Sequence, residues 1–471
     1  MHVQQLYTSC LSEAAYFIAS DGEAAVVDPL RDIQDYLALA KEHNVTIKYI
    51  FETHFHADFV SGHLELQKAT GATIIYGPSA VTNYKIYNAT HNETFTVGAL
   101  SIKALHTPGH TLESTCYLLH NEAGQPHCIF TGDTLFIGDV GRPDLSQKGE
   151  ELTMQDLAAT LYNSLQNHIH TLPNEVIIYP AHGAGSSCGK SLSKETFSTI
   201  GEQKESNYAL QPQSQAEFVT AVTQGLAAPP AYFPINAVIN KKGYEQLEAV
   251  LAKALTPLSI ATITQHIKDR DVILLDTRNA TTFTQGFIPT SIFIGLEGRF
   301  AEWAGSLIPY TSPIVLITEI GKEKETATRL TRVGLDNIQG YLLGGYEAWV
   351  KDGQQVDMII DVEADELAMD LPYDDNALIV DVRKETEFGN EHVEDAKNLS
   401  LAIITDPGNL AFIEDTDNLY IHCAGGYRSV IAASILKKEG FHNLRNVLGG
   451  WASISALPDK FKFVKEAAVL N

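Results

Sequence analysis

Two segments in the second half of the chain recur at a fixed distance, and this repeat limits the folds that the half can adopt. Both pairs of matching segments are offset by 105 residues: Val272–Arg278 with Ala377–Arg383, and Leu342–Trp349 with Val447–Ile454. An apolar run of four to eight residues between turn signals is typical of a buried strand in an α/β sheet. The repeat therefore predicts two copies of one α/β domain.

The 471 residues exceed what one hydrophobic core holds, so several domains are expected. Residues 1–240 read as strands broken by short helices, with a hairpin around Asp21-Gly22. We expect the two repeated domains at 259–355 and 356–471, joined to the first domain by a linker, 241–258. One helix from about Asn240 to Ala254 is expected to form that bridge.

The first domain contains histidines and a carboxylate at alternating positions, directly after the apolar run 47–51. His54, His56 and Asp58 project to one side of an extended backbone, because side chains alternate with a period of two. Three polar groups at this density need partners that a strand interior does not offer. The pattern predicts a metal site.

Further candidate ligands follow the ends of other expected strands. His110 lies in a Thr-Pro-Gly-His turn, Asp133 follows Phe-Thr-Gly, and His182 follows Tyr-Pro-Ala. Loops that place polar side chains at one edge of a rigid sheet commonly build a site. We therefore expect these three residues to join His54, His56 and Asp58.

The last repeat contains a cysteine on a glycine-containing loop between an expected strand, 418–422, and an expected helix, 430–439. The loop begins at Cys423 and continues with Ala424, Gly425, Gly426, Tyr427, Arg428 and Ser429. Backbone N–H groups and a helix N-terminus favour a thiolate and a bound persulfide anion, and Arg428 adds positive charge. The corresponding loop of the first repeat, 317–323, has Glu319 near the place of the nucleophile. A carboxylate cannot replace a thiolate nucleophile, so the first copy is predicted to lack the chemistry of the second.

The amino-acid composition limits the cellular compartment and the classes of partner that are expected for this protein. Five irregularly spaced cysteines do not form a disulfide framework, which indicates a reducing, cytoplasmic location. The formal net charge of −25 disfavours nucleic acid as a partner. No apolar run approaches the length of a membrane span, and the first residues lack the build of a signal peptide, so no membrane association is expected.

The His54, His56, Asp58, His110, Asp133 and His182 pattern resembles the metallo-β-lactamase superfamily. The resemblance implies an αββα sandwich over the first domain. Hydrolytic relatives such as glyoxalase II carry a histidine after the motif's aspartate as a ligand of a second metal, and this chain has Phe59 there. A phenyl ring cannot ligate a metal, which favours a mononuclear site.

The sequence resembles the persulfide dioxygenase branch of that superfamily. The resemblance implies one Fe(II) per chain, bound by His54, His110 and Asp133, with zinc as the alternative metal. Two histidines and a carboxylate on one face of Fe(II) leave positions for O₂ and sulfur. His56, Asp58 and His182 are then expected to orient ligands, hold water or relay protons, or to serve as alternative ligands.

Two further residues are candidates for substrate binding. In relatives the arginine equivalent to Arg142 lies near the carboxylate of the thiol cofactor, and a structural turn contact from Arg142 to Asp144 is the alternative. Cys188, six residues after His182 in a Gly/Ser-rich loop, is a candidate for persulfide exchange, with an inert loop thiol as the alternative. The chain lacks the His-Asp-Tyr pattern of glutathione-using relatives after His182, which leaves the carrier thiol open.

The Cys423 loop resembles the rhodanese active loop, and the repeat fits the rhodanese frame. The whole chain resembles a persulfide dioxygenase–rhodanese fusion, in which an inactive rhodanese copy precedes an active one. That resemblance implies a low-molecular-weight persulfide, O₂, sulfite and thiosulfate as small-molecule partners, and a homo-oligomer by analogy. Two other functions stay open: a zinc thioester hydrolase of glyoxalase II type fused to a rhodanese, and a non-enzymatic persulfide sensor or carrier.

Overall fold

The computed structural model describes residues 1–145 and 152–465. Residues 466–471, which belong to the expected last domain, lie outside the described residues. The chain divides into two compact units: Met1–Ala249 with Thr331–Gly334, and Val250–Leu330 with the chain from Leu335 onward. The expected αββα sandwich followed by two α/β domains is confirmed.

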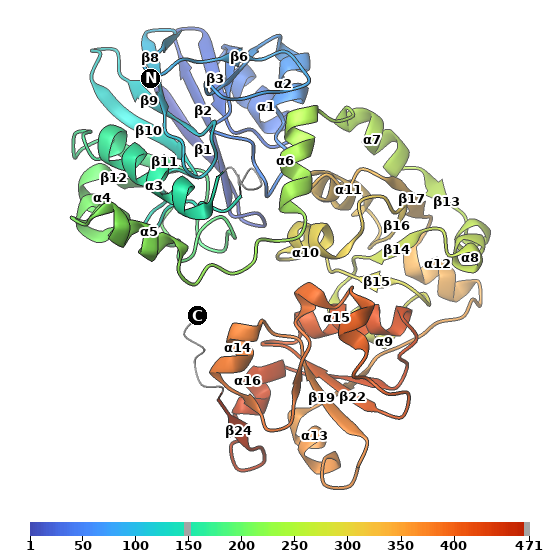
Figure 1. The fold of residues 1–471 in the computed structure, drawn as a ribbon. Coiled ribbons are helices and arrows are strands. Elements are labelled where there is room, and N and C mark those ends of the chain that lie inside the picture. The colour runs from blue at the N-terminus through green and yellow to red at the C-terminus, as the bar shows by residue number, and fades with distance from the viewer. Residues whose placement is uncertain (146–151, 466–471) are drawn as a thin grey trace. The chain divides into compact units, whose positions relative to one another are not determined.

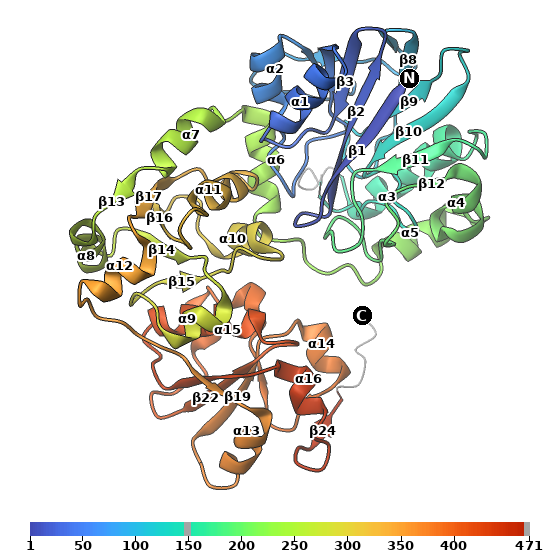
Figure 2. The ribbon, with the colours of Figure 1, turned by 180° about the vertical axis from the view of Figure 1, so that it is seen from behind.

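Unit 1 contains two six-stranded sheets that lie face to face (Figures 1 and 2). The first sheet has the strand order β1-β2-β3-β4-β5-β6: β1 (His2–Thr8), β2 (Glu13–Ser20), β3 (Glu23–Val27), β4 (Thr46–Phe51), β5 (Thr73–Tyr76) and β6 (Tyr87–Asn88). The second has the order β12-β11-β10-β9-β8-β7: β7 (Thr94–Val97), β8 (Leu100–His106), β9 (Thr115–His120), β10 (Pro126–Gly132), β11 (Ile177–Pro180) and β12 (Ser198–Thr199). The expected β2–β3 hairpin forms because Asp21 and Gly22 both adopt positive φ angles, 43° and 80°.

Three apolar layers hold unit 1 together. Residues such as Tyr16, Phe51 and Tyr117 fill the space between the sheets, with neighbouring aromatic rings in contact. Helices α1 (Gln34–Glu42) and α2 (His63–Thr70) cover the outer face of the first sheet. The outer face of the second sheet is covered by α3 (Met154–Ser164), α4 (Ile200–Ser206) and α5 (Gln215–Thr223).

The expected single bridging helix from Asn240 to Ala254 is wrong. The chain instead forms α6 (Phe233–Lys242) and α7 (Leu247–Ala254). Gly243 separates them at φ 86°, a left-handed conformation that ends a helix and that glycine adopts without strain. Asn240, which was expected to start the helix, is buried near the end of α6 and donates from Nδ2 to the backbone oxygens of His56 and Phe59.

Unit 2 contains the two repeats, each with a five-stranded parallel sheet. The first sheet has the order β13-β17-β16-β14-β15: β13 (Pro257–Leu258), β14 (Ile273–Asp276), β15 (Ile292–Phe293), β16 (Ile314–Ile317) and β17 (Ile338–Leu342). The second has the order β18-β23-β22-β19-β21: β18 (Ile360–Val362), β19 (Ala377–Asp381), β21 (Lys397–Asn398), β22 (Asn418–His422) and β23 (Leu444–Val447). The identical strand order confirms the duplication that the 105-residue offset predicts.

Helices flank both parallel sheets, as parallel strands require on their two faces. In the first repeat they are α8 (Ile260–Asp269), α9 (Ala280–Gln285), α10 (Phe300–Leu307), α11 (Glu323–Thr331) and α12 (Gly345–Lys351). In the second they are α13 (Ala364–Asp370), α14 (Glu385–Asn390), α15 (Tyr427–Lys438) and α16 (Gly450–Ser455). A small antiparallel pair, β20 (His392–Val393) and β24 (Phe463–Val464), completes the second repeat.

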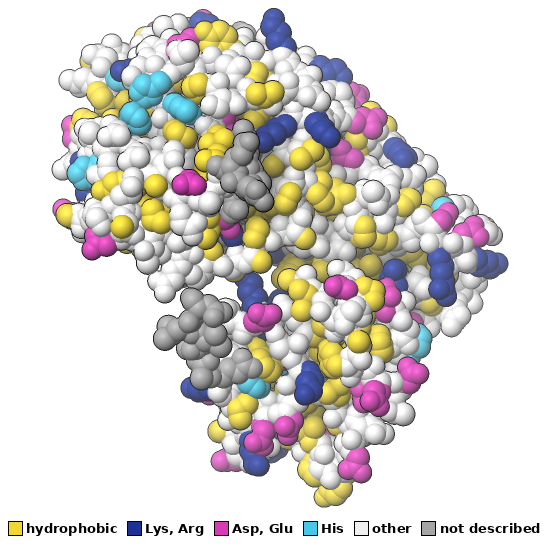
Figure 3. Space-filling model, in the orientation of Figure 1, with side chains coloured by type: hydrophobic (Ala, Val, Ile, Leu, Met, Phe, Trp, Pro, Cys, Tyr) yellow, Lys and Arg dark blue, Asp and Glu magenta, His cyan; other side chains and the backbone are white. Residues whose placement is uncertain are grey.

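The face drawn in Figure 3 shows basic, acidic and hydrophobic side chains interspersed. Within the part of the chain that the structure describes, none of the helices is both long enough and apolar enough to cross a bilayer.

Candidate metal centre and thiol loop

Three predicted ligands meet at the end of the unit 1 sheets. His54 follows β4, Asp133 follows β10, and His110 lies in the loop between β8 and β9. One ligand atom from each residue lies within 4.8 Å of the others, and all three side chains are buried. Asp133 Oδ2 is 3.3 Å from His110 Nε2 and 3.8 Å from His54 Nε2. We call these three residues the metal group.

The other predicted residues form a second group beside the first. His56, Asp58 and His182 also bring one ligand atom each within 4.8 Å of one another. His182 Nε2 lies 3.4 Å from Asp58 Oδ2 and 3.4 Å from Asp133 Oδ1. Asp133 therefore faces the metal group with one oxygen and the second group with the other.

The chemistry of these residues fits a metal ion such as iron or zinc. Within the described residues, both carboxylate oxygens of Asp133, both of Asp58 and Nε2 of His182 are buried without a hydrogen-bond partner. Buried polar atoms are rarely left unpaired, and a cation satisfies such converging acceptors. Burial, reinforced by the neighbouring histidines, lowers the pKa of His54 well below its usual value, so its imidazole is neutral, as a ligand must be.

Sequence reasoning missed the residues that orient the first ligand. Thr53 Oγ1 lies 2.8 Å from Asp28 Oδ2 and 3.0 Å from His54 Nδ1. The hydroxyl donates to the carboxylate and accepts from Nδ1–H, which directs Nε2 of His54 toward Asp133. Asp28 directly follows β3, just as the expected ligands follow other strands. This position at a strand end is the feature by which the sequence could have identified Asp28 as part of the site.

His56 is a member of the second group and also lies beside two buried carboxylates, Asp28 and Glu52. Its Nε2 lies 3.0 Å from Asp28 Oδ1 and 3.6 Å from Glu52 Oε2, although neither contact has the alignment of a hydrogen bond. Asp28, Glu52 and His56 also place ligand atoms within 4.8 Å of one another. His56 is therefore one junction between the metal site and a buried acidic pair behind it.

Phe59, directly after Asp58, is fully buried and packs on His56. The two ring centroids are 4.3 Å apart, with an angle of 32° between the planes. A phenyl ring therefore occupies the space beside His56 and offers no donor atom there.

Cys188 lies beside the metal site. Its thiol is buried, and its sulfur lies within 4.8 Å of ligand atoms of Asp133 and His182. Burial, followed by the charges of Asp58 and Asp133, raises the pKa of this thiol well above its usual value. The structure thus places Cys188 among the candidate ligands rather than on an open loop.

Arg142 makes the turn contact that was the structural alternative to substrate binding. Nε and Nη2 donate to the two carboxylate oxygens of Asp144, each at 2.7 Å. Nη1 also donates to the backbone oxygen of Ser187 at 3.1 Å, and Nη2 to that of Ala227 at 2.6 Å. The guanidinium is thus engaged with the protein itself, and the substrate contact stays a prediction.

A cavity of about 400 Å³ reaches the metal group at His110. Apolar side chains such as Phe55, Leu112 and Phe233 form much of its wall. Lys241 places its ammonium 5.0 Å above the Phe55 ring. Among the described residues, the wall of the cavity therefore combines apolar side chains with one cation, Lys241, and one carboxylate, Glu113.

The Cys423 loop lies between β22 and the first turn of α15, so Tyr427, Arg428 and Ser429 start the helix rather than precede it. The backbone N–H of Gly426 donates to Cys423 Sγ at 3.1 Å, and Ser429 Oγ lies 3.7 Å from the same sulfur. Gly426 has φ 100°, a left-handed conformation that glycine adopts without strain. This geometry suits a sulfur anion.

Arg428 contributes its charge as part of an ion pair. Its Nη1 and Nη2 lie 2.7 and 2.9 Å from the carboxylate oxygens of Glu387 on α14. The hydrogen bonds from Arg428 lower the pKa of Glu387. Glu387 was not foreseen, because its helix begins two residues after Asp381-Val382-Arg383 with no pattern that marks it.

Comparisons with known proteins agree with this architecture. The model of the metallo-beta-lactamase superfamily matches residues 9–182, and the rhodanese-like domain model matches residues 259–352 and 363–457. A crystal structure of a metallo-beta-lactamase from Staphylococcus aureus subsp. aureus COL is 32% identical, covering 72% of this chain and 98% of that chain at a TM-score of 0.66.

Two further similarities cover smaller shares of this chain. The crystal structure of ETHE1 from Myxococcus xanthus is 29% identical, covering 51% of this chain and 100% of that chain at a TM-score of 0.43. A curated probable hydroxyacylglutathione hydrolase from Schizosaccharomyces pombe is 34% identical over 164 residues, which is 34% of this chain. The match spans 59% of that relative's length.

Proposed function

Because the chain belongs to the metallo-β-lactamase superfamily and continues into two rhodanese-like domains, we propose that it is a persulfide dioxygenase coupled to a sulfurtransferase. The first reaction is R–S–SH + O₂ + H₂O → R–SH + SO₃²⁻ + 2H⁺, with a low-molecular-weight thiol as carrier. His54, His110 and Asp133 would hold one Fe(II), which would supply the one-electron steps that O₂ requires.

The observation that carries the proposal is the composition of the centre. Two histidines and one carboxylate converge from separate loops, and a buried phenyl ring, Phe59, occupies the position of a second-metal ligand in hydrolytic relatives. Two histidines and a carboxylate suit non-haem Fe(II) chemistry, which needs open positions for two reactants. A water bridged by two metals, the usual hydrolytic nucleophile, is disfavoured by the same phenyl ring.

The chain's own residues have distinct tasks in this reaction. The apolar wall of Phe55 and Phe233 excludes bulk water, and Lys241 attracts an anionic part of the carrier thiol. His182, beside Asp58 and Asp133, is suited to take the proton that the persulfide loses. Burial alone would lower the pKa of His182, but the two carboxylates outweigh it and raise that pKa.

The second reaction uses Cys423. Its thiolate takes the sulfane sulfur of a persulfide, and the resulting Cys423 persulfide passes that sulfur to sulfite, giving thiosulfate; the reverse direction is equally allowed by the same geometry. Both chemistries on one chain raise the effective concentration of each product for the next step. The hydrogen bond from Gly426 N–H to the Cys423 sulfur supports this role.

A zinc thioester hydrolase is the second candidate, and two observations favour it. A relative of the first domain is named a probable hydroxyacylglutathione hydrolase. Asp133, His182 and Cys188 also offer donors for a second ion despite Phe59. The two candidates differ in metal content, in oxygen consumption and in thioester cleavage.

Metal analysis of anaerobically purified protein, followed by oxygen-electrode traces with organic persulfides, tests the proposal. We expect one iron per chain, oxygen uptake that His110→Ala abolishes, and normal uptake in Cys423→Ser. His127→Ala, on strand β10 but outside the metal group, is the matched control and should retain uptake. Two zincs per chain with hydrolysis of S-lactoylglutathione would establish the hydrolase instead, and a protein without turnover would be a persulfide sensor or carrier.

A further inference from the structure

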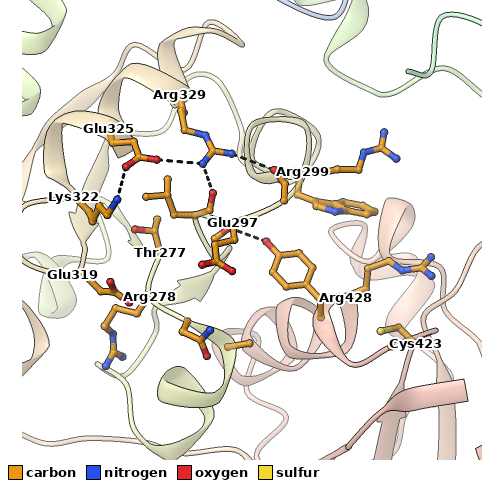
Figure 4. Close-up of a pocket in the computed structure, with 18 of the residues that line it drawn as sticks. Thr277, Arg278, Glu297, Arg299, Glu319, Lys322, Glu325, Arg329, Cys423 and Arg428 are labelled. Atoms are coloured by element: carbon orange, nitrogen blue, oxygen red, sulfur yellow. Dashed lines mark hydrogen bonds and ion pairs between the residues drawn. The ribbon is translucent and has the colours of Figure 1, made fainter. Parts of the chain in front are cut away.

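The active and the inactive repeat share one cavity of about 820 Å³. Figure 4 shows Cys423 and Arg428 of the second repeat on one side, and Glu319, Lys322 and Arg278 of the first repeat on the other. The cysteine-less loop, residues 317–323, therefore faces the same space as the catalytic cysteine. We call this space the shared cavity.

The walls of the shared cavity are held together by hydrogen bonds between the repeats. Tyr427 Oη donates to the backbone oxygen of Gly295 at 2.9 Å, and the Phe293 N–H donates to Ser434 Oγ at 2.9 Å. The Phe293 bond is buried, and buried hydrogen bonds are costly to break. The first repeat thus forms a fixed half of the cavity.

The cavity is far larger than thiosulfate or sulfite requires. Sites of roughly 300 to 1,000 Å³ enclose drug-sized organic ligands. A cavity of about 820 Å³ therefore fits the organic part of a persulfide in addition to its sulfur atoms. Trp303 of the first repeat adds a large aromatic surface to the wall.

Two residues of the first repeat that line the cavity also have buried polar atoms without a hydrogen-bond partner among the described residues. Within the described residues, Thr277 Oγ1 and Arg278 Nη1 have no hydrogen-bond partner, and both residues line the shared cavity. Both side chains are almost fully buried. An unpaired buried polar group is unfavourable by about 1–3 kcal/mol, so a polar ligand or water is expected there.

The charges lining the cavity indicate the kind of ligand. Several cations are already paired: Arg428 with Glu387, Arg278 with Asp276, and Lys322 with Glu325. No ion pair is found for the side chains of Lys384, Glu297 and Glu319 among residues 1–145 and 152–465.

These three unpaired side chains belong to different repeats. Lys384 follows β19, the strand adjacent to the Cys423 strand β22, whereas Glu297 and Glu319 belong to the first repeat. Among the described residues, the cavity thus offers an unpaired cation on the side of the second repeat and unpaired carboxylates on the side of the first. On that side Arg299 is paired with Glu302, and Lys322 and Arg329 are paired with Glu325. This arrangement is complementary to a thiol that carries both a carboxylate and an amine.

We propose that the shared cavity binds the persulfide of an amino-acid or peptide thiol, with its sulfane sulfur at Cys423 and its amine held by Glu297 and Glu319. The cysteine-less repeat is then the substrate-binding half of the sulfurtransferase. This inference rests on the sulfur-transfer part of the proposed function and not on the dioxygenase part.

The transfer step balances without an added oxidant. The reaction is Cys423–S⁻ + R–S–SH → Cys423–S–S⁻ + R–SH. The bond from Cys423 Sγ to the outer sulfur forms, the bond between the two persulfide sulfurs breaks, and the leaving thiolate takes the persulfide proton. Sulfite then accepts the sulfur: Cys423–S–S⁻ + SO₃²⁻ → Cys423–S⁻ + S₂O₃²⁻.

Donor kinetics test the inference with three sulfur donors: glutathione persulfide, N-acetylglutathione persulfide, which lacks the free amine, and thiosulfate. We expect the double variant Glu297→Gln/Glu319→Gln to raise KM for glutathione persulfide five- to tenfold. KM for the acetylated donor and for thiosulfate should stay within twofold. The matched control is Glu248→Gln/Glu414→Gln, two exposed glutamates outside the cavity, which should leave all three values unchanged.

A binding measurement gives a readout without turnover. S-methylglutathione should protect Cys423 from iodoacetamide, followed by mass spectrometry, and the double variant should need five- to tenfold more of it. Equal KM shifts for thiosulfate, or unchanged protection, would overturn the inference. Oxygen uptake of the same proteins is measured in parallel, so a failed dioxygenase assay and a failed donor assay are distinguishable.

Discussion

His110 Nδ1 lies 2.8 Å from the backbone carbonyl oxygen of Arg142. This contact fixes the imidazole so that Nε2, the other ring nitrogen, faces Asp133. Gly141 lies close to the same histidine: a Cβ there would overlap the backbone oxygen of Asp133 and come within 2.8 Å of His110 Nδ1. The segment around Arg142 thus acts on the metal site through its backbone.

Arg142→Lys is expected to lower the iron content of the purified protein several-fold. Lysine cannot form the bidentate contact with Asp144, so the backbone oxygen that orients His110 loses its support. Iron per chain by elemental analysis and KM for a persulfide measure the effect. Full iron content with a raised KM would instead assign Arg142 to substrate binding.

Thr53→Val should weaken iron binding about 10- to 100-fold, the usual effect of removing a group that orients a ligand. The substitution keeps the shape of the side chain but removes the hydroxyl between Asp28 and His54. Iron retention against increasing chelator measures it. Thr46→Val, at the exposed start of β4, is the matched control, and equal retention in both variants would contradict the role of Thr53.

Acid should destabilise unit 1 through His63. Burial lowers the pKa of His63 to about 3, and neither ring nitrogen has a hydrogen-bond partner among the described residues. His63 is therefore protonated below about pH 6.5 in the unfolded chain but only below about pH 3 in the folded chain. The free energy of unfolding consequently falls as pH falls from 6.5 to 3. The slope from this residue is up to about 1.4 kcal/mol per pH unit.

His63→Phe tests this linkage, because it removes the titrating group and keeps an aromatic ring against Tyr84. Calorimetric scans of metal-free protein from pH 7.5 to 5 should show a shallower loss of Tm than the unsubstituted chain. His442→Phe, at an exposed position of the second repeat, serves as the control. The same pH dependence in all three proteins would refute the assignment.

Gly426→Ala should reduce sulfur transfer about tenfold while leaving oxygen uptake unchanged. Gly426 has φ 100°, where a Cβ introduces strain of about 1–2 kcal/mol, and relief of that strain moves the N–H away from Cys423 Sγ. Gly440→Ala is closely matched, since Gly440 has φ 103° and open space around it but lies at the far end of α15. A similar loss in both variants would indicate general destabilisation.

The polar site residues at the strand ends and the duplication of the second domain were predictable, because both depend on local sequence patterns. The alternation of His54, His56 and Asp58, and the 105-residue offset, are both properties of neighbouring residues or of simple self-similarity. The convergence of His110 and Asp133 on His54 followed from the rule that strand ends share a sheet edge. The same reasoning placed Cys423 at the start of a helix.

Other features depend on contacts that the sequence does not mark. Asp28 reaches the metal site through Thr53, 25 positions later in the chain, and the ion pair of Arg428 with Glu387 spans 41 positions. The break at Gly243 lies in a polar stretch, whereas the expected single helix depended on the apolar spacing from Leu247 to Leu251. The hydrogen bond from Arg142 to the backbone oxygen of Ala227 spans 85 positions, and no local motif predicts it.

The shared cavity also means that the two repeats together form one binding site. A C-terminal fragment beginning near residue 356 would keep its nucleophile but would meet a donor molecule with only half of the surrounding surface. Such a fragment should turn over small inorganic donors and discriminate poorly among organic ones. On the proposal made for this cavity, the cysteine-less repeat provides part of the donor selectivity of the sulfurtransferase.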